Sequence, residues 1–133
     1  QFSSLVKKYK PEVLAGIESR GFIFASTIAY KLGCDVIMIR KKGKLPGKTI
    51  HHFYKLEYGT DCLEIQKRET LKNKNVILID DLLATGGTAS AAIELLKKVE
   101  ANISAFLTLI ELTNLKGRDK IKVETDSLIS FDE

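Results

Sequence analysis

Apolar and polar residues follow two different periods along the chain, and each change of period marks a new element. Residues 12–18 (EVLAGIE) form a short apolar run that predicts a buried strand, and Ser19–Gly21 predicts the turn that ends it. From Gly21 to Leu32 the apolar positions follow the i, i+3, i+4, i+7 spacing of a helix, which Gly33 closes. Residues 35–40 (DVIMIR) predict a second buried strand. The first forty residues therefore predict a strand–helix–strand unit with a right-handed crossover.

The same pattern returns in the second half of the chain. Val76–Leu83 is the most apolar predicted strand, Gly87–Glu100 has the apolar face of a helix, and Ser104–Leu112 predicts a further strand. Lys116–Lys120 predicts a short helical turn, and Ser127–Phe131 predicts a last strand.

Between these two units the sequence predicts a half-exposed hairpin. Phe53–Gly59 and Cys62–Lys67 alternate apolar with polar residues, with a turn expected at Gly59–Asp61. Strands that alternate with helices predict an α/β fold, with a mainly parallel sheet flanked by helices on both faces. We expect a single domain over residues 1–133, with ligands bound outside the carboxyl ends of the strands.

Composition excludes several classes of protein. The chain of 133 residues is 44% hydrophobic and 29% charged, as in a soluble globular domain, and no apolar run approaches membrane-spanning length. A net charge of +4 is too small to predict nucleic-acid binding, and the basic residues cluster without interleaved aromatics. Cys34 and Cys62 lack metal-ligand spacing, which predicts two free thiols in a reducing cytoplasm, with a disulfide as the alternative.

The strongest chemical signal is VILIDDLLATGGTAS, at Val76–Ser90. The glycines of the turn would let backbone N–H groups surround an anion at a helix N-terminus, which predicts a phosphate site; taken alone, the turn could equally be a helix cap. Asp80 and Asp81 cannot donate hydrogen bonds when ionised, so beside a phosphate they need donors such as ribose hydroxyls. Alternatively, one acid pairs locally and the other is solvated.

The segment VILIDDLLATGGT resembles the phosphoribosyl diphosphate signature of the type I phosphoribosyltransferases. Four further segments resemble the adenine branch of that family in kind and order: ESRGF at Glu18–Phe22, RKKGKLPG at Arg40–Gly47, LEYG at Leu56–Gly59 and ELTNLKGR at Glu111–Arg118. The resemblance implies transfer of the 5-phosphoribosyl group from phosphoribosyl diphosphate to adenine, giving AMP and pyrophosphate. A transferase for another base and a non-catalytic binder of the diphosphate or of AMP are the alternatives.

The resemblance also implies roles for the matching residues. Asp80 and Asp81 would bind the ribose hydroxyls. The 5′-phosphate would be bound by Ala84, Thr85, Gly86, Gly87 and Thr88. The pyrophosphate loop would consist of Glu18, Ser19 and Arg20, with a cis peptide before the serine. From the residues alone, Glu18 and Arg20 could equally form a surface ion pair.

Residues 41–57 match the family's mobile catalytic loop. Arg40, Lys42 and Lys44 would neutralise the leaving pyrophosphate, and Glu57 would exchange a proton with the purine beside Tyr58. The catalytic residues implied are Arg40, Lys44, Glu57 and Tyr58. Without the resemblance, Glu57 would be interpreted as an exposed strand residue and the basic cluster as a solvated loop.

The remaining expectations concern the base, the metal and the assembly. Leu112 resembles a residue lining the base pocket, although an apolar strand end is commonly just core. Mg²⁺ is expected to arrive with the diphosphate rather than in a dedicated protein site, and His51-His52 is interpreted as a loop feature. The family implies a homodimer. Its members also carry an N-terminal hood, which nothing before Gln1 supplies here, so an N-terminal piece is expected to be missing.

Overall fold

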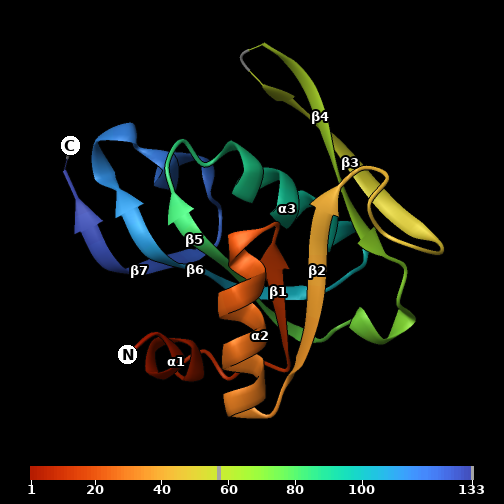
Figure 1. Ribbon diagram of the computed structural model, residues 1–133, viewed down its shortest axis with the longest axis horizontal. Coiled ribbons are helices and arrows are strands. Elements are labelled where there is room, and N and C mark those ends of the chain that lie inside the picture. Colours follow the sequence, from red (N-terminus) through yellow and green to blue (C-terminus); the bar gives the residue numbers. More distant parts are fainter. Residues whose placement is uncertain (57, 133) are drawn as a thin grey trace.

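In the computed structural model, which describes residues 1–56 and 58–132, one sheet forms the centre of the molecule (Figure 1). Its seven strands within the described residues are β1 (Val13–Ile17), β2 (Asp35–Lys41), β3 (Thr49–Leu56), β4 (Gly59–Gln66), β5 (Asn75–Leu83), β6 (Asn102–Leu112) and β7 (Glu124–Phe131). Their order is β3-β4-β2-β1-β5-β6-β7. Strands β2, β1, β5, β6 and β7 run parallel, and β3 and β4 form an antiparallel hairpin at one edge. The predicted mainly parallel sheet is confirmed.

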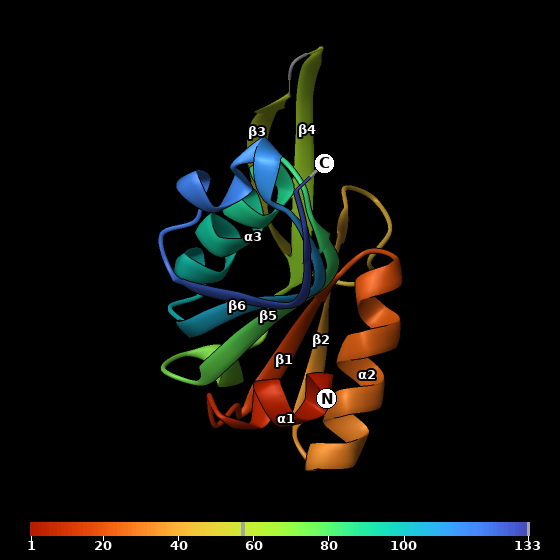
Figure 2. The same cartoon turned by 90° about the vertical axis from the view of Figure 1, so that its left-hand side faces the viewer.

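Helices cover both faces of this sheet. They are α1 (Phe2–Lys7), α2 (Arg20–Leu32) and α3 (Gly87–Lys98), with 3₁₀ turns η1 (Glu69–Leu71), η2 (Thr113–Leu115) and η3 (Gly117–Lys120). Figure 2 shows α1 and α2 on one side of the sheet and α3 on the other. Alternate residues of β5 point to opposite faces of the sheet. Ile77 and Ile79 pack with α1 and α2, whereas Val76 and Leu78 pack with α3. The two-sided architecture is therefore also confirmed.

Most predicted elements lie where the periodicity placed them. Helix α2 ends at Gly33, whose φ of 73° is the left-handed conformation that glycine adopts at a helix C-terminus. The sequence missed α1, because a helix of six residues is too short to show a helical period, although Phe2, Leu5 and Val6 are buried. Strand β7 begins at Glu124 rather than at Ser127.

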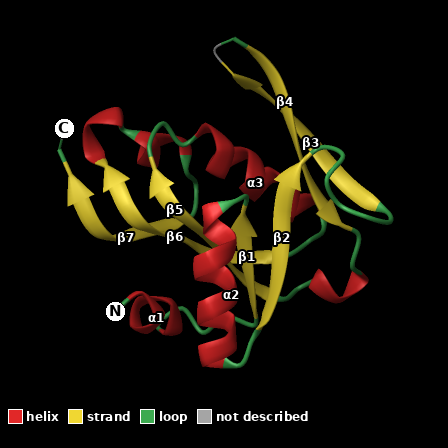
Figure 3. Ribbon diagram, in the orientation of Figure 1, coloured by secondary structure: helices red, strands yellow, loops and turns green. Residues whose placement is uncertain are grey.

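The predicted turn of the hairpin is wrong. Figure 3 shows β3 and β4 joined as a hairpin. Strand β3 ends at Leu56, which pairs directly with Gly59, so the turn precedes Gly59 and contains Tyr58. Asp61, expected in the turn, instead pairs with Tyr54 inside the hairpin. The segment expected as a loop over residues 41–57 is consequently a strand from Thr49 onward. Glu57 itself lies outside the described residues.

Two smaller expectations concern thiols and membranes. Cys34 is half-buried and Cys62 is buried, and both are free, as their spacing predicted. Within the described chain, the helices are too short or too polar to cross a lipid bilayer.

Candidate active site

A cavity of about 390 Å³ opens where β1 and β5 end. Two continuous segments, residues 17–20 and 80–89, form most of its wall, together with Lys41 and Leu63. Gly16 of β1 pairs with Ile79 of β5, so the segments that follow these parallel strands leave the sheet side by side. This is the edge at which open α/β sheets bind their ligands.

The wall after β5 has the form of an anion site. Gly86 has a φ of 86°, a left-handed conformation, and it is the residue immediately before α3. Because Gly86 has no side chain to cap the helix, the first N–H groups of α3 remain available to a ligand. The first bond within the helix runs from Ser90 N to Gly86 O at 2.9 Å. Helix N-termini of this kind bind phosphate groups.

Two acids stand beside this loop, in different electrostatic states. Asp81 accepts a hydrogen bond from Arg20 Nε at 2.5 Å, and the Arg20 side chain is 73% exposed. Asp80 Oδ1 accepts a hydrogen bond from the Asp81 amide at 2.8 Å. Burial, followed by the side-chain hydrogen bond and the charge of Asp81, raises the pKa of Asp80 to about 8. Asp81 thus pairs locally, but Asp80 is half-buried rather than solvated.

The opposite wall collects cations around Glu18. The Glu18–Ser19 peptide bond is cis, as expected. The Glu18 carboxylate accepts hydrogen bonds from the Lys41 amide and from Lys44 Nζ, and Arg40 Nε lies 3.6 Å away. Burial alone would raise the pKa of Glu18, but these hydrogen bonds together hold it below its ordinary value. Arg20 pairs with Asp81, so the alternative of a surface pair between Glu18 and Arg20 is wrong.

Comparison with known proteins identifies the fold family. The phosphoribosyl transferase domain model matches residues 2–132. The chain belongs to the phosphoribosyltransferase family. It is 52% identical over 132 residues to the adenine phosphoribosyltransferase of Rhodospirillum rubrum, covering 99% of this chain and 77% of that protein. It is 50% identical to the Acidiphilium cryptum enzyme of the same name, covering 100% of this chain and 78% of that protein.

Solved structures of phosphoribosyltransferases agree with this assignment. Adenine phosphoribosyltransferase from Saccharomyces cerevisiae, complexed with an imino-altritol bisphosphate and adenine, superposes with a TM-score of 0.87 at 41% identity, covering 95% of this chain and 72% of that one. The Trypanosoma brucei enzyme, in complex with AMP, pyrophosphate and ribose-5-phosphate, gives a TM-score of 0.84 at 30% identity, covering 95% of this chain and 61% of that one.

The structure of this phosphoribosyltransferase brings most of the predicted site residues to one cavity. Those lining it are Glu18, Ser19, Arg20, Asp80, Asp81, Ala84, Thr85, Gly86, Gly87 and Thr88. Arg40 and Lys44 adjoin it through their contacts with Glu18. Segments more than sixty residues apart in sequence therefore meet at the end of the sheet.

Other predicted residues lie away from the cavity. Tyr58 is 93% exposed in the turn of the β3–β4 hairpin, and Lys42 Nζ lies 5.4 Å above the Phe53 ring. Leu112 is half-buried at the end of β6, outside the cavity wall. Because Glu57 lies outside the described residues, its role stays a prediction, as do the roles of these three residues.

Sequence reasoning missed Lys41 and Leu63 as parts of the wall. Lys41 is the last residue of β2, and its side chain forms an ion pair with Asp61 and donates to the Tyr54 hydroxyl at 2.9 Å. Leu63 pairs with Lys41 across β2 and β4. Lys41 fell in the segment expected as a loop over residues 41–57, and Leu63 fell in a strand expected to pair only within the hairpin, so no sequence pattern indicated that these two residues pair.

Proposed function

We propose that this protein transfers the 5-phosphoribosyl group of phosphoribosyl diphosphate to adenine, forming AMP and releasing pyrophosphate. The observation that carries the proposal is the meeting of the acid pair, Asp80 and Asp81, with the Ala84–Thr88 loop in one cavity. A sugar phosphate offers the two chemistries that these walls require, hydroxyl donors and an anion. The names of the relatives and the ligands of the Saccharomyces and Trypanosoma enzymes support adenine as the acceptor.

The donor's sugar phosphate lies along the wall after β5. N–H groups at the start of α3 donate to the 5′-phosphate, and the hydroxyls of Thr85 and Thr88 add donors without adding charge. The ribose hydroxyls donate to the carboxylates of Asp80 and Asp81. This arrangement fixes C1 of the ribose toward the opposite wall, where the cations gather.

The pyrophosphate group lies at the Glu18–Arg20 wall. Arg20, exposed and paired with Asp81 before the ligand arrives, turns to the phosphate oxygens, which leaves Asp81 free to accept from the ribose. Arg40 and Lys44, held near the cavity by Glu18, neutralise the negative charge that develops on the leaving group.

The transfer step breaks the bond between C1 and the diphosphate oxygen and forms a bond from C1 to a ring nitrogen of adenine. The electron pair of the broken bond leaves with pyrophosphate, and the proton of the ring nitrogen passes to the carboxylate of Glu57. Tyr58 and Leu112 complete the base side of the site when the hairpin closes over it, and closure excludes water from the reacting carbon. These base-side roles rest on the motif alone.

Magnesium fits this site as a companion of the diphosphate. Over the described residues, 1–56 and 58–132, no three His, Cys, Asp or Glu side chains gather as a metal-binding group. The carboxylates of the cavity face ribose hydroxyls and cations, so the oxygens of the diphosphate would be the main ligands of Mg²⁺. The ion would reduce the charge of the diphosphate, and it would enter and leave with it.

A substrate panel tests the proposed reaction. With phosphoribosyl diphosphate and Mg²⁺, we expect adenine to be converted to AMP with release of one pyrophosphate per turnover, measured by chromatography of the nucleotides. Hypoxanthine, guanine and orotate serve as competing bases. Turnover with one of these bases instead of adenine would overturn the base assignment. Calorimetric binding of AMP without any turnover would make the protein a non-catalytic binder.

We also propose that the protein is a cytoplasmic homodimer that associates through α2. Ile23 and Tyr30 are 64% and 93% exposed, and they lie seven residues apart on one stripe of that helix. Met38, on the neighbouring strand β2, is 42% exposed and extends the apolar surface. Such a patch is typical of an interface. The two free thiols support a reducing compartment.

Sedimentation velocity tests the association. We expect wild type to sediment as a dimer and the Ile23→Lys/Tyr30→Lys double variant as a monomer, because two buried charges would oppose the apolar contact. Glu94→Lys, on helix α3 at the opposite face of the sheet, adds a comparable charge and should leave the dimer intact. A wild-type protein that stays monomeric at every concentration would contradict the proposal.

A further inference from the structure

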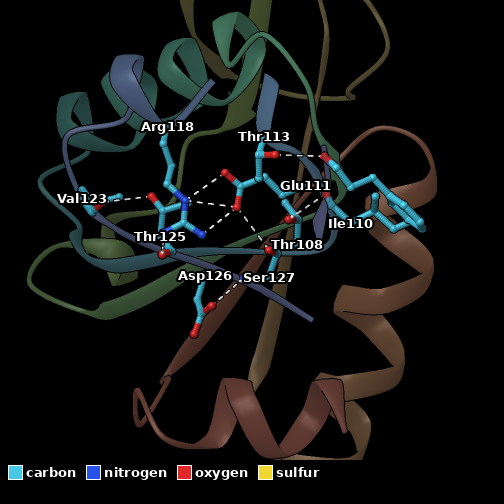
Figure 4. A network of polar contacts seen from close by, with 10 residues as sticks. Thr108, Ile110, Glu111, Thr113, Arg118, Val123, Thr125, Asp126 and Ser127 are labelled. Carbon is cyan, nitrogen blue, oxygen red and sulfur yellow. Dashed lines mark hydrogen bonds and ion pairs between the residues drawn. The ribbon is translucent and has the colours of Figure 1, made fainter. Parts of the chain in front are cut away.

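The proposed mechanism does not use the ion pair between Glu111 and Arg118. This pair lies beside the Ala84–Thr88 loop, called the phosphate loop below, because Gly117, the residue before Arg118, contacts that loop. Glu111, near the end of β6, is 5% exposed. Arg118, in η3, donates to both of its carboxylate oxygens, with Nη2 2.6 Å from Oε1 and Nε 2.9 Å from Oε2 (Figure 4). A two-point contact of this kind fixes the orientation of the guanidinium group as well as its distance.

The same arginine also reaches β7. Its Nη1 donates to the Thr125 carbonyl at 2.6 Å, and Ser127 Oγ donates to Glu111 at 3.2 Å. The hydrogen bonds from Arg118 lower the pKa of Glu111 against the opposing effect of burial, and Glu111 in turn raises the pKa of Arg118. Both groups therefore stay charged at neutral pH. The turn built from η2 and η3 is tied to two strands of the sheet.

The residue before Arg118 rests directly on the phosphate loop. A Cβ atom on Gly117 would lie 2.3 Å from the Ala84 carbonyl oxygen, and a Cβ atom on Gly86 would lie 2.5 Å from the Gly117 carbonyl oxygen. Side-chain carbons do not approach backbone this closely, so the two backbones are in contact with no space between them. A movement of Gly117 toward the loop would therefore displace it, and a movement away would remove the surface on which the loop rests.

We propose that Arg118 and Glu111 are a positioning pair that holds the Ala84–Thr88 loop in its anion-binding shape and so sets the affinity for the 5′-phosphate. The inference rests on the proposed function for the identity of the anion. Arg118 contacts Glu111, Thr125 and the turn rather than the ligand, and it acts only through Gly117. The pyrophosphate wall at residues 18–20 comes from a different strand and does not depend on this pair.

The buried charge of Glu111 explains how the ion pair holds the η2–η3 turn in place. Removing Arg118 leaves the buried carboxylate of Glu111 without its counter-ion, which is unfavourable unless the surrounding chain moves to hydrate it. The segment that would move is the turn itself. Lys116, which joins η2 to η3, has a φ of 54°, a conformation that local propensity disfavours for lysine, so contacts with the sheet must hold the turn in place.

The test compares two ligands in one variant. In Arg118→Gln, we expect affinity for ribose 5-phosphate to fall by about tenfold or more, while affinity for pyrophosphate stays within about twofold, by calorimetry. Arg68→Gln is the matched control, because the described hydrogen bond of the Arg68 side chain goes to Gln66, far from Gly117 in the sequence. Amide NMR of the unliganded protein adds a direct measurement: Gly86 and Gly87 should shift in Arg118→Gln and not in Arg68→Gln.

Two results of the ligand comparison would overturn the inference. These are an unchanged affinity for ribose 5-phosphate, and an equal loss of affinity for ribose 5-phosphate and for pyrophosphate. Either result would show that the pair stabilises the fold in general and does not position the phosphate loop. If Arg118→Gln does not fold, Arg118→Lys carries the same test, because lysine keeps the charge that Glu111 needs and loses the two-point contact. A wild-type protein that binds ribose 5-phosphate but transfers nothing to adenine would refute the proposed reaction, and the ligand comparison would still decide the role of Arg118.

Discussion

Replacing Asp80 and Asp81 together with asparagine is expected to weaken AMP binding by about 10²-fold to 10⁴-fold. A hydrogen bond from a ribose hydroxyl to an ionised carboxylate is worth about 1.5–3 kcal/mol, and the double variant loses two such bonds. Calorimetric titration of wild type and variant with AMP gives both affinities directly. Equal affinities in the two proteins would show that the ribose does not lie against these acids.

The same replacement should raise the free energy of unfolding of the unliganded protein, and we expect the gain to come from the substitution of Asp80. Its folded pKa of about 8 lies above the unfolded value near 3.9, so the folded state resists losing this proton. Stability is therefore lost progressively as pH rises from about 4 to about 8, at up to about 1.4 kcal/mol per pH unit. Asparagine has no proton to lose. Asp80→Asn should consequently melt higher than wild type by a margin that grows up to about pH 8.

Two controls separate these effects. Asp81→Asn breaks an ion pair whose arginine is largely exposed, and it leaves burial, the main cause of the raised Asp80 pKa, in place, so its melting temperature should change less than that of Asp80→Asn. AMP affinity in wild type should rise by up to about tenfold per pH unit between about 6.5 and 8, because the ionised carboxylate of Asp80 accepts a ribose hydroxyl bond more strongly than the neutral carboxyl does. In Asp80→Asn this dependence should disappear. Its persistence would assign the titration to another group.

Gly86→Ala is expected to be the most damaging substitution in the phosphate loop. Alanine costs about 1–2 kcal/mol in a left-handed conformation, and here its Cβ would also lie 2.5 Å from the Gly117 carbonyl oxygen. We expect the free energy of unfolding to fall by about 2–4 kcal/mol in urea, with ribose 5-phosphate affinity reduced by more than about tenfold.

Gly33→Ala is the matched control for this substitution. Gly33 has a φ of 73°, but a Cβ atom there would meet nothing within 4 Å. Gly33→Ala should therefore lower the free energy of unfolding only by the cost of placing alanine in a left-handed backbone conformation, about 1–2 kcal/mol, and should leave ligand affinity unchanged. If the two variants are destabilised equally, the contact between the phosphate loop and Gly117 contributes nothing.

The sequence predicted the two strand–helix–strand units because each strand and helix has its own hydrophobic period. The prediction of the hairpin turn was wrong for a physical reason. Gly59, Thr60 and Asp61 are residue types that favour turns, yet they pair as strand residues with Leu56, Lys55 and Tyr54, and this cross-strand pairing decided the register. No local pattern distinguishes these two outcomes.

The candidate site shows the same division. The acid pair and the phosphate loop are contiguous in sequence, so a motif could predict them together. The contact between Gly117 and the loop joins residues about thirty positions apart, and the ion pair of Glu111 with Arg118 spans a turn that has no repeating period. Such contacts depend on how β5, β6 and η3 pack, which only the folded chain determines.

Helix α3 connects the wall of the cavity to the β3–β4 hairpin. Its first residue follows the phosphate loop, and near its other end Lys98 Nζ donates to the His51 carbonyl of the hairpin at 2.9 Å. Its 12 residues span about 18 Å and behave as a stiff rod. The helix therefore joins the loop that precedes it to strand β3 of the hairpin, so the position of the loop and the position of the hairpin are mechanically linked through one rigid element.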